Sequence, residues 1–156
     1  NPGHEYGYQP FEAAQIDAVI ALCQQLKQTY HIRAHQFVGH SDIAPLRKED
    51  PGELFPWAIL AKHGIGLWHE LTFNIFTTTP LLFPYSQNKA VETLQEKLHL
   101  FGYAIPRNGL FDESTEAVVM AFKRHFCPET LGKYWDSWAD SVLNDLIKKR
   151  PSTNEH

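Results

Sequence analysis

The sequence predicts an α/β unit followed by an all-α unit of three helices. Residues 11–39 pass from helical apolar spacing into a short run typical of a strand. From residue 86 onward, the apolar residues recur only at helical spacing. A chain of 156 residues can hold one domain or two small ones. We expect two, covering residues 1–79 and 80–150.

In the first unit, an amphipathic helix is expected over residues 11–30. A short strand over 36–39 should follow, which is the α/β arrangement with function at the carboxyl end of a strand. A short helix over 57–62 would end before Gly64 and Gly66. The apolar residues that define the first helix are Phe11, Ala14, Ile16, Val19, Ile20, Cys23, Leu26 and Tyr30.

Residues 68–85 have no sustained period and contain Pro80 and Pro84. We interpret them as the connection between the two units, packed rather than loose because many of them are apolar. Three helices should follow, over 88–100, over 113–126 with Asp112 as N-cap, and from Asp136 or Ser137 onward. The first two should pack together and bury Leu94, Leu98, Val118 and Phe122.

The charge and the hydrophobic pattern argue against nucleic-acid binding and against a membrane-spanning helix. The formal net charge is −4, and no cluster of Lys and Arg runs along the chain, which argues against nucleic acid. No apolar run reaches the length of a membrane span.

Chemistry-bearing residues gather in the stretch from Val38 to Gly52. His40 and Asp50 are zinc-type ligands, and Lys48 lies two residues before the carboxylate. Pro51 and Gly52 force a turn that can aim Asp50 back toward His40. A catalytic zinc site needs three protein ligands, and this segment offers two.

Other readings of these residues stay open. Lys48 could be a surface cation paired with Glu49 or Asp50. Asp42 could orient His40 or simply cap the loop.

Arg47 could contact a substrate carboxylate or make a surface salt bridge. We expect no metal ligation by His4, and His156 is terminal. The remaining histidines have no partner at a telling spacing and are expected to be structural or solvated. The four tryptophans are expected in the core.

The run Gly39-His40-Ser41-Asp42-Ile43-Ala44-Pro45, followed by Arg47-Lys48-Glu49-Asp50-Pro51-Gly52 and Phe55-Pro56-Trp57, resembles the C-terminal motif of zinc-dependent N-acetylmuramoyl-L-alanine amidases. The resemblance implies that His40 and Asp50 bind Zn²⁺ and that Lys48 assists catalysis. In that family a further zinc His and a catalytic Glu lie upstream. We therefore expect this chain to lack part of the site, to be impaired alone, and to need an N-terminal fragment of the same protein.

Residues 86–126 resemble the peptidoglycan-binding three-helix domain. The matching residues are Leu94-Gln95, Leu98, Gly102-Tyr103, Gly109-Leu110-Phe111-Asp112, Thr115 and Ala121-Phe122. The same spacing would also suit any small helical bundle.

Together the resemblances imply a zinc hydrolase that cleaves the amide bond between N-acetylmuramic acid and L-alanine. Its substrate would be peptidoglycan or a muropeptide, in the periplasm or at the outer membrane of a Gram-negative bacterium. The competing hypothesis is a non-catalytic cell-wall binding module with a decayed amidase motif. A transferase or protease of similar architecture fits the motif less well.

Overall fold

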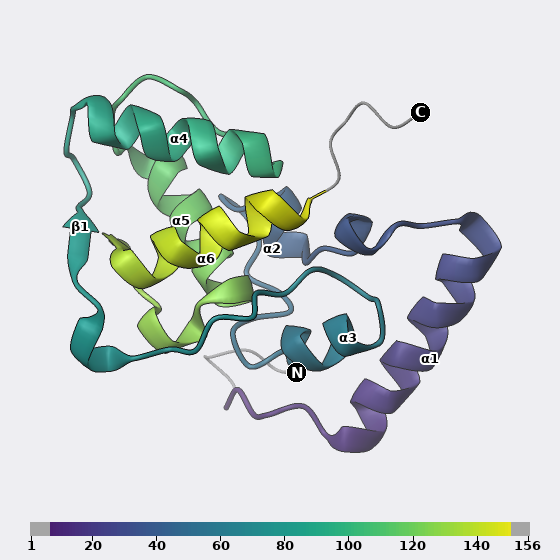
Figure 1. Ribbon diagram of the computed structural model, residues 1–156. Helices are drawn as coiled ribbons and strands as arrows, with labels where there is room; N and C mark the ends of the chain where they lie inside the picture. Colours follow the sequence, from purple (N-terminus) through teal and green to yellow (C-terminus); the bar gives the residue numbers. More distant parts are fainter. Residues whose placement is uncertain (1–6, 151–156) are drawn as a thin grey trace.

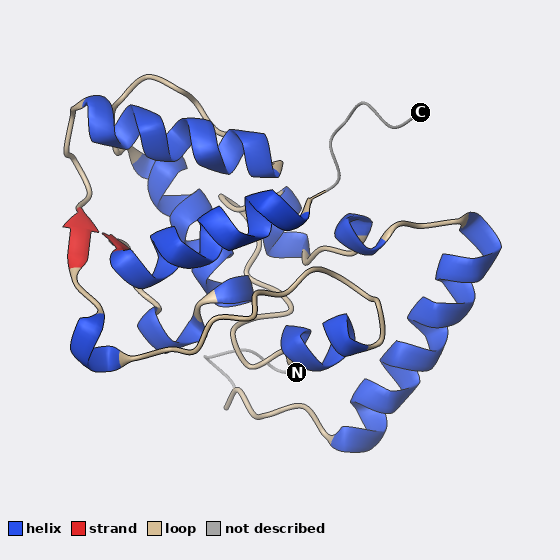
Figure 2. Cartoon of the chain, in the orientation of Figure 1, coloured by secondary structure: helices blue, strands red, loops and turns tan. Residues whose placement is uncertain are grey.

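The computed structural model describes residues 7–150, so His4 and His156 lie outside the described residues. The chain is mainly helical with one small sheet (Figures 1 and 2). In Figure 1, α1 stands at one edge of the molecule, and α4, α5 and α6 gather at the opposite side. The helices are α1 (Ala13–Tyr30), α2 (His40–Ile43), α3 (Trp57–Lys62), α4 (Lys89–Phe101), α5 (Glu113–Phe126) and α6 (Ser137–Lys149). The strands are β1 (Pro80–Leu82) and β2 (Trp135–Asp136), and short 3-10 turns span Ala34–Gln36, Ile75–Thr77 and Pro128–Thr130.

The expected longer helices are all present, and side-chain caps explain where three of them begin. Asn88, Asp112 and Asp136 each accept a hydrogen bond from the backbone N–H three residues later, at 3.0, 2.9 and 2.8 Å. Each bond satisfies one of the free N–H groups at a helix start. The expected N-cap role of Asp112 is confirmed.

Helices α4, α5 and α6 enclose the larger of two hydrophobic cores. The predicted contact between α4 and α5 is confirmed, because Leu94, Leu98, Val118 and Phe122 are all buried in this core. Trp57, Trp135 and Trp138 are buried as expected. The smaller core forms between α1 and α3 and contains Ile16, Ile20, Trp57, Leu60 and Ile65.

The strand expected over residues 36–39 does not form within the residues that the structure describes, where residues 7–79 hold helices, 3-10 turns and irregular backbone. Residues 37–39 are irregular, following the 3-10 turn at Ala34–Gln36. A strand needs a neighbouring strand to pair its N–H and C=O groups. In residues 7–150 the one sheet contains β1 and β2, which both follow residue 79.

The all-α prediction for the second unit also needs correction. Strands β1 and β2 pair antiparallel, with Pro80 opposite Asp136 and Leu82 opposite Trp135. The backbone N–H of Ser137 donates to the carbonyl of Thr79 at 2.9 Å. The second unit therefore combines three helices with a two-stranded sheet, and the end of the connection is paired into it.

The connection is packed, as expected. Trp68 contacts both hydrophobic cores. The buried His69 places Nε2 3.1 Å from the carbonyl of Phe126 and packs edge-on against Trp138. Since the carbonyl can only accept, Nε2 carries the hydrogen. Burial lowers the pKa of His69 below its ordinary value of 6.5.

A buried ion pair joins α5 to the start of α6. Lys123 Nζ lies 2.6 Å from Asp136 Oδ2, and both side chains are fully buried. The same ammonium donates to the carbonyl of Thr130 at 2.8 Å and lies 4.0 Å from the centre of the Tyr134 ring. Burial lowers the pKa of Lys123, and the hydrogen bond to Asp136 opposes that shift.

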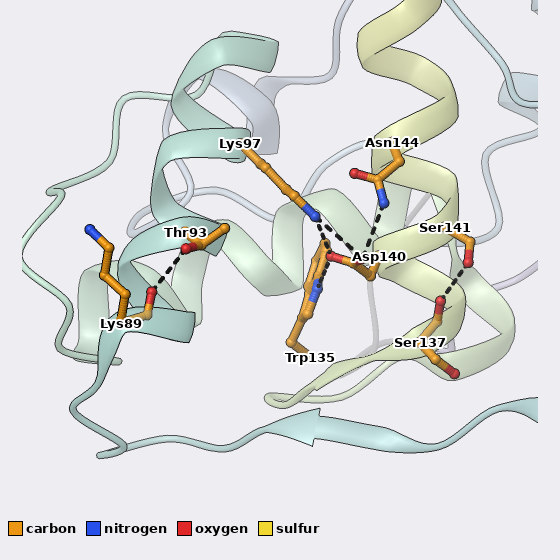
Figure 3. A network of polar contacts seen from close by, with 8 residues as sticks. All are labelled: Lys89, Thr93, Lys97, Trp135, Ser137, Asp140, Ser141 and Asn144. Carbon is orange, nitrogen blue, oxygen red and sulfur yellow. Dashed lines mark hydrogen bonds and ion pairs between the residues drawn. The ribbon is translucent and has the colours of Figure 1, made fainter.

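A second polar network joins α4 to α6 at the surface (Figure 3). The Asp140 carboxylate accepts from Lys97 Nζ at 3.1 Å, Trp135 Nε1 at 3.2 Å and Asn144 Nδ2 at 3.1 Å. Because Lys97 and Asp140 are each about one-third exposed, solvent screens this pair far more than the buried one.

The buried pair gives a first prediction. Asp136→Asn keeps a side chain that caps α6 but removes the partner of a buried charge. The free energy of unfolding in urea at pH 7 should fall by about 3 kcal/mol. Glu92→Gln is the control, because its partner Lys89 is 82% exposed, and it should cost about 0.5 kcal/mol or less. Equal, small losses for both variants would contradict the stabilising role assigned to Asp136.

His69 gives a second prediction. The unfolded chain takes up a proton at His69 as the pH falls through about 6.5, whereas folded His69 resists it. Its contribution to stability is therefore complete above pH 6.5 and is lost as the pH falls toward the folded pKa. His69→Gln keeps an N–H donor but does not titrate. Denaturant melts at pH 7 and pH 5 should show a smaller loss of stability in the variant than in the parent chain. An equal loss in both would refute this.

Candidate functional site

The segment from Gly39 to Gly52, here called the site loop, is closed by backbone and tyrosine hydrogen bonds. The N–H of Ser41 donates to the carbonyl of Asp50 at 2.9 Å, which joins the two ends of the loop. Tyr8 braces the following turn, because its hydroxyl donates to the carbonyl of Pro51 at 3.1 Å and accepts from the N–H of Leu54 at 3.0 Å. Asp50 and Pro51 are joined by a cis peptide bond.

Gly39 is required by this closure. A Cβ at this position would lie 2.9 Å from Cδ of Pro51 and 3.2 Å from Oδ2 of Asp42. Any larger residue would push the two ends of the site loop apart. A glycine is therefore needed immediately before His40.

The loop brings His40 and Asp50 together. His40 Nδ1 lies 3.2 Å from Asp50 Oδ2, and the side chains are 50% and 63% exposed. An imidazole nitrogen and a carboxylate oxygen at this separation fit two ligands of one zinc ion, each bound at about 2 Å. In residues 7–150, no group of three or more His, Cys, Asp or Glu side chains is placed to hold a metal. The described residues thus bring two zinc-type donors together, one fewer than the three protein ligands of a catalytic zinc site.

Lys48 is half-buried at the end of the same loop, where its backbone N–H donates to the carbonyl of Ala44 at 3.0 Å. The two acids next to it bond elsewhere. Glu49 Oε1 lies 2.7 Å from Arg124 Nη2 on α5, and Asp50 faces His40. Within residues 7–150 the Lys48 ammonium therefore has no carboxylate partner, unlike the surface pair considered from the sequence.

Asp42 does not contact the His40 ring through a hydrogen bond within the described chain; its partners are elsewhere. Its Oδ2 accepts from the backbone N–H of Gly39 at 2.7 Å and lies 2.7 Å from His125 Nδ1. Its Oδ1 accepts from the Tyr103 hydroxyl at 2.6 Å. Sequence reasoning missed His125 and Tyr103, because they lie 83 and 61 residues from Asp42 and no local pattern connects them.

The cluster of Asp42, Tyr103 and His125 is buried, and the side chains of His125 and Asp42 are only 3% and 7% exposed. Burial by itself raises the pKa of Asp42, but attraction to His125 and the hydrogen bonds from His125, Tyr103 and Gly39 outweigh it, so the pKa lies below its ordinary value. Burial, and then the neighbouring Asp42 charge, raise the pKa of Tyr103 well above 10.0. At neutral pH an ionised carboxylate thus faces a neutral phenol.

Ring stacking holds His125 in place. Its ring centroid lies 4.0 Å from that of Trp57, with an angle of 18° between the planes, and 3.8 Å from that of Phe126, at 8°. Trp57 belongs to α3 and to the motif that follows the site loop. The motif after the site loop therefore contacts the helical unit through the Trp57 ring, which stacks on His125 of α5.

A cavity of about 100 Å³ lies beside this cluster, with Phe37, Ile43, Phe101 and Tyr103 among its lining residues. None of His40, Lys48 and Asp50 lines it. Small-molecule sites usually measure about 300–1,000 Å³. The cavity is therefore smaller than a usual small-molecule site, and it lies apart from His40, Lys48 and Asp50.

Comparison with known protein families gives two separate matches. Residues 1–53 match the N-acetylmuramoyl-L-alanine amidase family, and residues 87–134 match the putative peptidoglycan binding domain. The first match includes the whole site loop. The second spans α4, the loop after it, and α5.

Two relatives cover nearly the whole chain. N-acetylmuramoyl-L-alanine amidase AmiD of Escherichia coli is 35% identical over 147 residues, which are 91% of this chain and 50% of AmiD. The putative N-acetylmuramoyl-L-alanine amidase RC0497 of Rickettsia conorii is 32% identical over 88% of this chain and 55% of its own length. The chain thus spans about half the length of these relatives.

Solved structures agree with this assignment. AmiD from E. coli, in complex with anhydro-N-acetylmuramic acid-L-Ala-D-gamma-Glu-L-Lys, matches 92% of this chain and 55% of its own, with a TM-score of 0.73 and 34% identity. AmpDh3 from Pseudomonas aeruginosa matches 94% and 57%, with a TM-score of 0.72 and 28% identity. Along the half of those proteins that it spans, this chain is homologous to the N-acetylmuramoyl-L-alanine amidases, with one region that matches the amidase family and one that matches the peptidoglycan-binding domain family.

Proposed function

We propose that this chain supplies the C-terminal half of a zinc-dependent amidase that cleaves the bond between N-acetylmuramic acid and L-alanine in bacterial peptidoglycan. The observation that carries the proposal is the 3.2 Å approach of His40 Nδ1 to Asp50 Oδ2 in the site loop. The family match over residues 1–53 and the names of the relatives support it.

His40 and Asp50 would hold the zinc ion, with at least one further ligand from outside residues 7–150. Bound zinc lowers the pKa of a water molecule toward about 7 and polarises an amide carbonyl. The half-exposed positions of His40 and Asp50 leave the metal open to substrate. Ser41, Tyr8 and Gly39 keep the two ligands close by closing the site loop.

Lys48 would stabilise the negative charge that develops on the amide carbonyl oxygen during attack. Its ammonium is not neutralised by Glu49 or Asp50, since both carboxylates bond to other residues. A fixed positive charge in a partly dry site stabilises a developing oxyanion at little reorganisation cost. Lys48 is thus a candidate catalytic residue.

We further propose that residues 1–79 are the C-terminal part of the catalytic domain and residues 80–150 a peptidoglycan-binding domain. The substrate would be a muropeptide, as in the AmiD and AmpDh3 complexes. The E. coli and Rickettsia relatives support a place in the Gram-negative periplasm or at the outer membrane. In the described chain, no helix combines the length and the apolar character needed to cross a bilayer.

The upstream half of the protein would complete the first unit. Val38, Ile43 and Leu46, on and beside the site loop, are 43%, 70% and 59% exposed. Exposed apolar side chains gathered on one segment indicate a surface that another segment covers. An upstream strand beside residues 37–39 would also offer pairing to backbone that is irregular here.

A non-catalytic cell-wall binding module is the alternative, favoured by the presence of only two zinc-type donors at the site loop among the described residues. Zinc binding and turnover discriminate between the two functions.

The metal assignment gives a third prediction. Zinc titrated into the chain should shift the backbone amide resonances of the site loop. His40→Ala or Asp50→Ala should weaken this binding at least tenfold, because each removes one of two donors. His63→Ala is the control, since His63 is exposed at the end of α3. The zinc role would be refuted if the His63 change weakened binding as much as either ligand change.

Lys48 gives a fourth prediction. In a protein that includes the upstream half, Lys48→Ala should lower amidase turnover by a factor on the order of 10² or more while zinc content stays the same. Lys62→Ala, a change to an exposed lysine on α3, should leave turnover unchanged. Full activity of the Lys48 variant would remove this residue from the mechanism, and absence of turnover in the parent protein would favour the binding-module alternative.

A further inference from the structure

The strongest unexplained feature of the molecule is that the site loop is attached to the helical unit at two neighbouring positions of α5. Arg124 Nη2 lies 2.7 Å from Glu49 Oε1, and His125 Nδ1 lies 2.7 Å from Asp42 Oδ2. The first pair has an exposed carboxylate, 67% accessible, whereas the second pair is almost fully buried. The second attachment is therefore the one that is shielded from solvent and fixed by close packing.

Asp42 links His125 to the backbone next to His40. The oxygen that faces His125 also accepts the N–H of Gly39, the residue immediately before His40. Asp42 thus holds the start of α2, and Tyr103 fixes its other oxygen at 2.6 Å. Movement of this carboxylate would move the backbone on both sides of His40.

We infer that His125 and Tyr103 are positioning residues for the proposed zinc ligand His40, so that the peptidoglycan-binding unit is also a structural part of the catalytic site. The consequence at the metal rests on the proposed function, whereas the control of the loop does not. His125 supplies the donor that Asp42 faces, and its stacking on Trp57 fixes the ring. Separation of the two units would leave Asp42 without two of its three donors.

Amide hydrogen exchange in the full chain tests the inference without any metal. The reporters are the N–H groups of Gly39, bonded to Asp42, and Ser41, bonded to Asp50. Tyr103→Phe removes one hydroxyl and keeps the ring. Loss of one hydrogen bond to a charged group should make both reporters exchange about tenfold faster or more.

Two substitutions at His125 separate hydrogen bonding from packing. His125→Asn keeps an N–H donor near the position of Nδ1 but loses the stacked ring, and His125→Phe does the reverse. The reporters should exchange faster in the Phe variant than in the Asn variant. The opposite order would overturn the inference, because packing alone would then hold the site loop.

Thr115→Val is the matched control. Thr115 is fully buried in the helical unit, where its hydroxyl accepts from Gln95, and it has no hydrogen bond to the site loop in the described chain. This variant should leave Gly39 and Ser41 exchange unchanged. If it accelerated both reporters as much as Tyr103→Phe, general destabilisation would explain the result and the inference would fail.

Zinc supplies the second readout. In Tyr103→Phe, the dissociation constant measured by NMR titration with zinc alone should rise about tenfold, the lower range for residues that orient a metal ligand. Unchanged exchange in Tyr103→Phe overturns the inference whatever the metal does. If the parent chain binds no zinc, the proposed metal site fails, while the exchange data still decide whether His125 and Tyr103 hold the loop.

Discussion

The packing of the site loop against the helical unit depends on the hydrogen bonds of the buried Asp42 carboxylate. Asp42 is one short side chain, yet it receives a hydrogen bond from its own loop, from the loop after α4 and from α5. A carboxylate taken out of water is costly unless its oxygens are bonded. The three donors meet that requirement only when the site loop and the helical unit are docked, which makes docking and loop geometry interdependent.

Around Asp42, apolar side chains extend the interface between the first unit and the helical unit. Trp57 stacks on His125, and Trp68 belongs to both hydrophobic cores. The connection from residue 67 onward lies against the helical core and ends in strand β1, paired with β2. The two units are therefore joined along a continuous surface and are not tethered by a flexible linker. In the proposed enzyme, the helical unit would therefore face the site loop in one orientation.

The residues proposed to act on the substrate and the residues that support them lie on different sides of the site loop. His40, Lys48 and Asp50 remain accessible or half-buried, as residues that meet a substrate must be. Asp42 and Gly39 lie on the inner side, where close packing sets the backbone. In the proposed site, this arrangement would give the two exposed ligands a defined geometry before metal binding, because folding has already ordered the loop.

The helices from residue 86 onward and the closeness of His40 and Asp50 could be predicted from local sequence. Those features depend on nearby residues, namely apolar spacing, the caps Asn88, Asp112 and Asp136, and the turn at Pro51–Gly52. The irregular backbone at 37–39 could not be predicted in this way, because a strand forms only beside a partner. The pairing of β1 with β2 joins residues more than 50 positions apart and likewise depends on the whole fold. The role of Asp42 depends on the fold as well. A carboxylate bonds to whichever donors the fold brings near it, and those donors come from residues 103 and 125, which no local pattern links to residue 42.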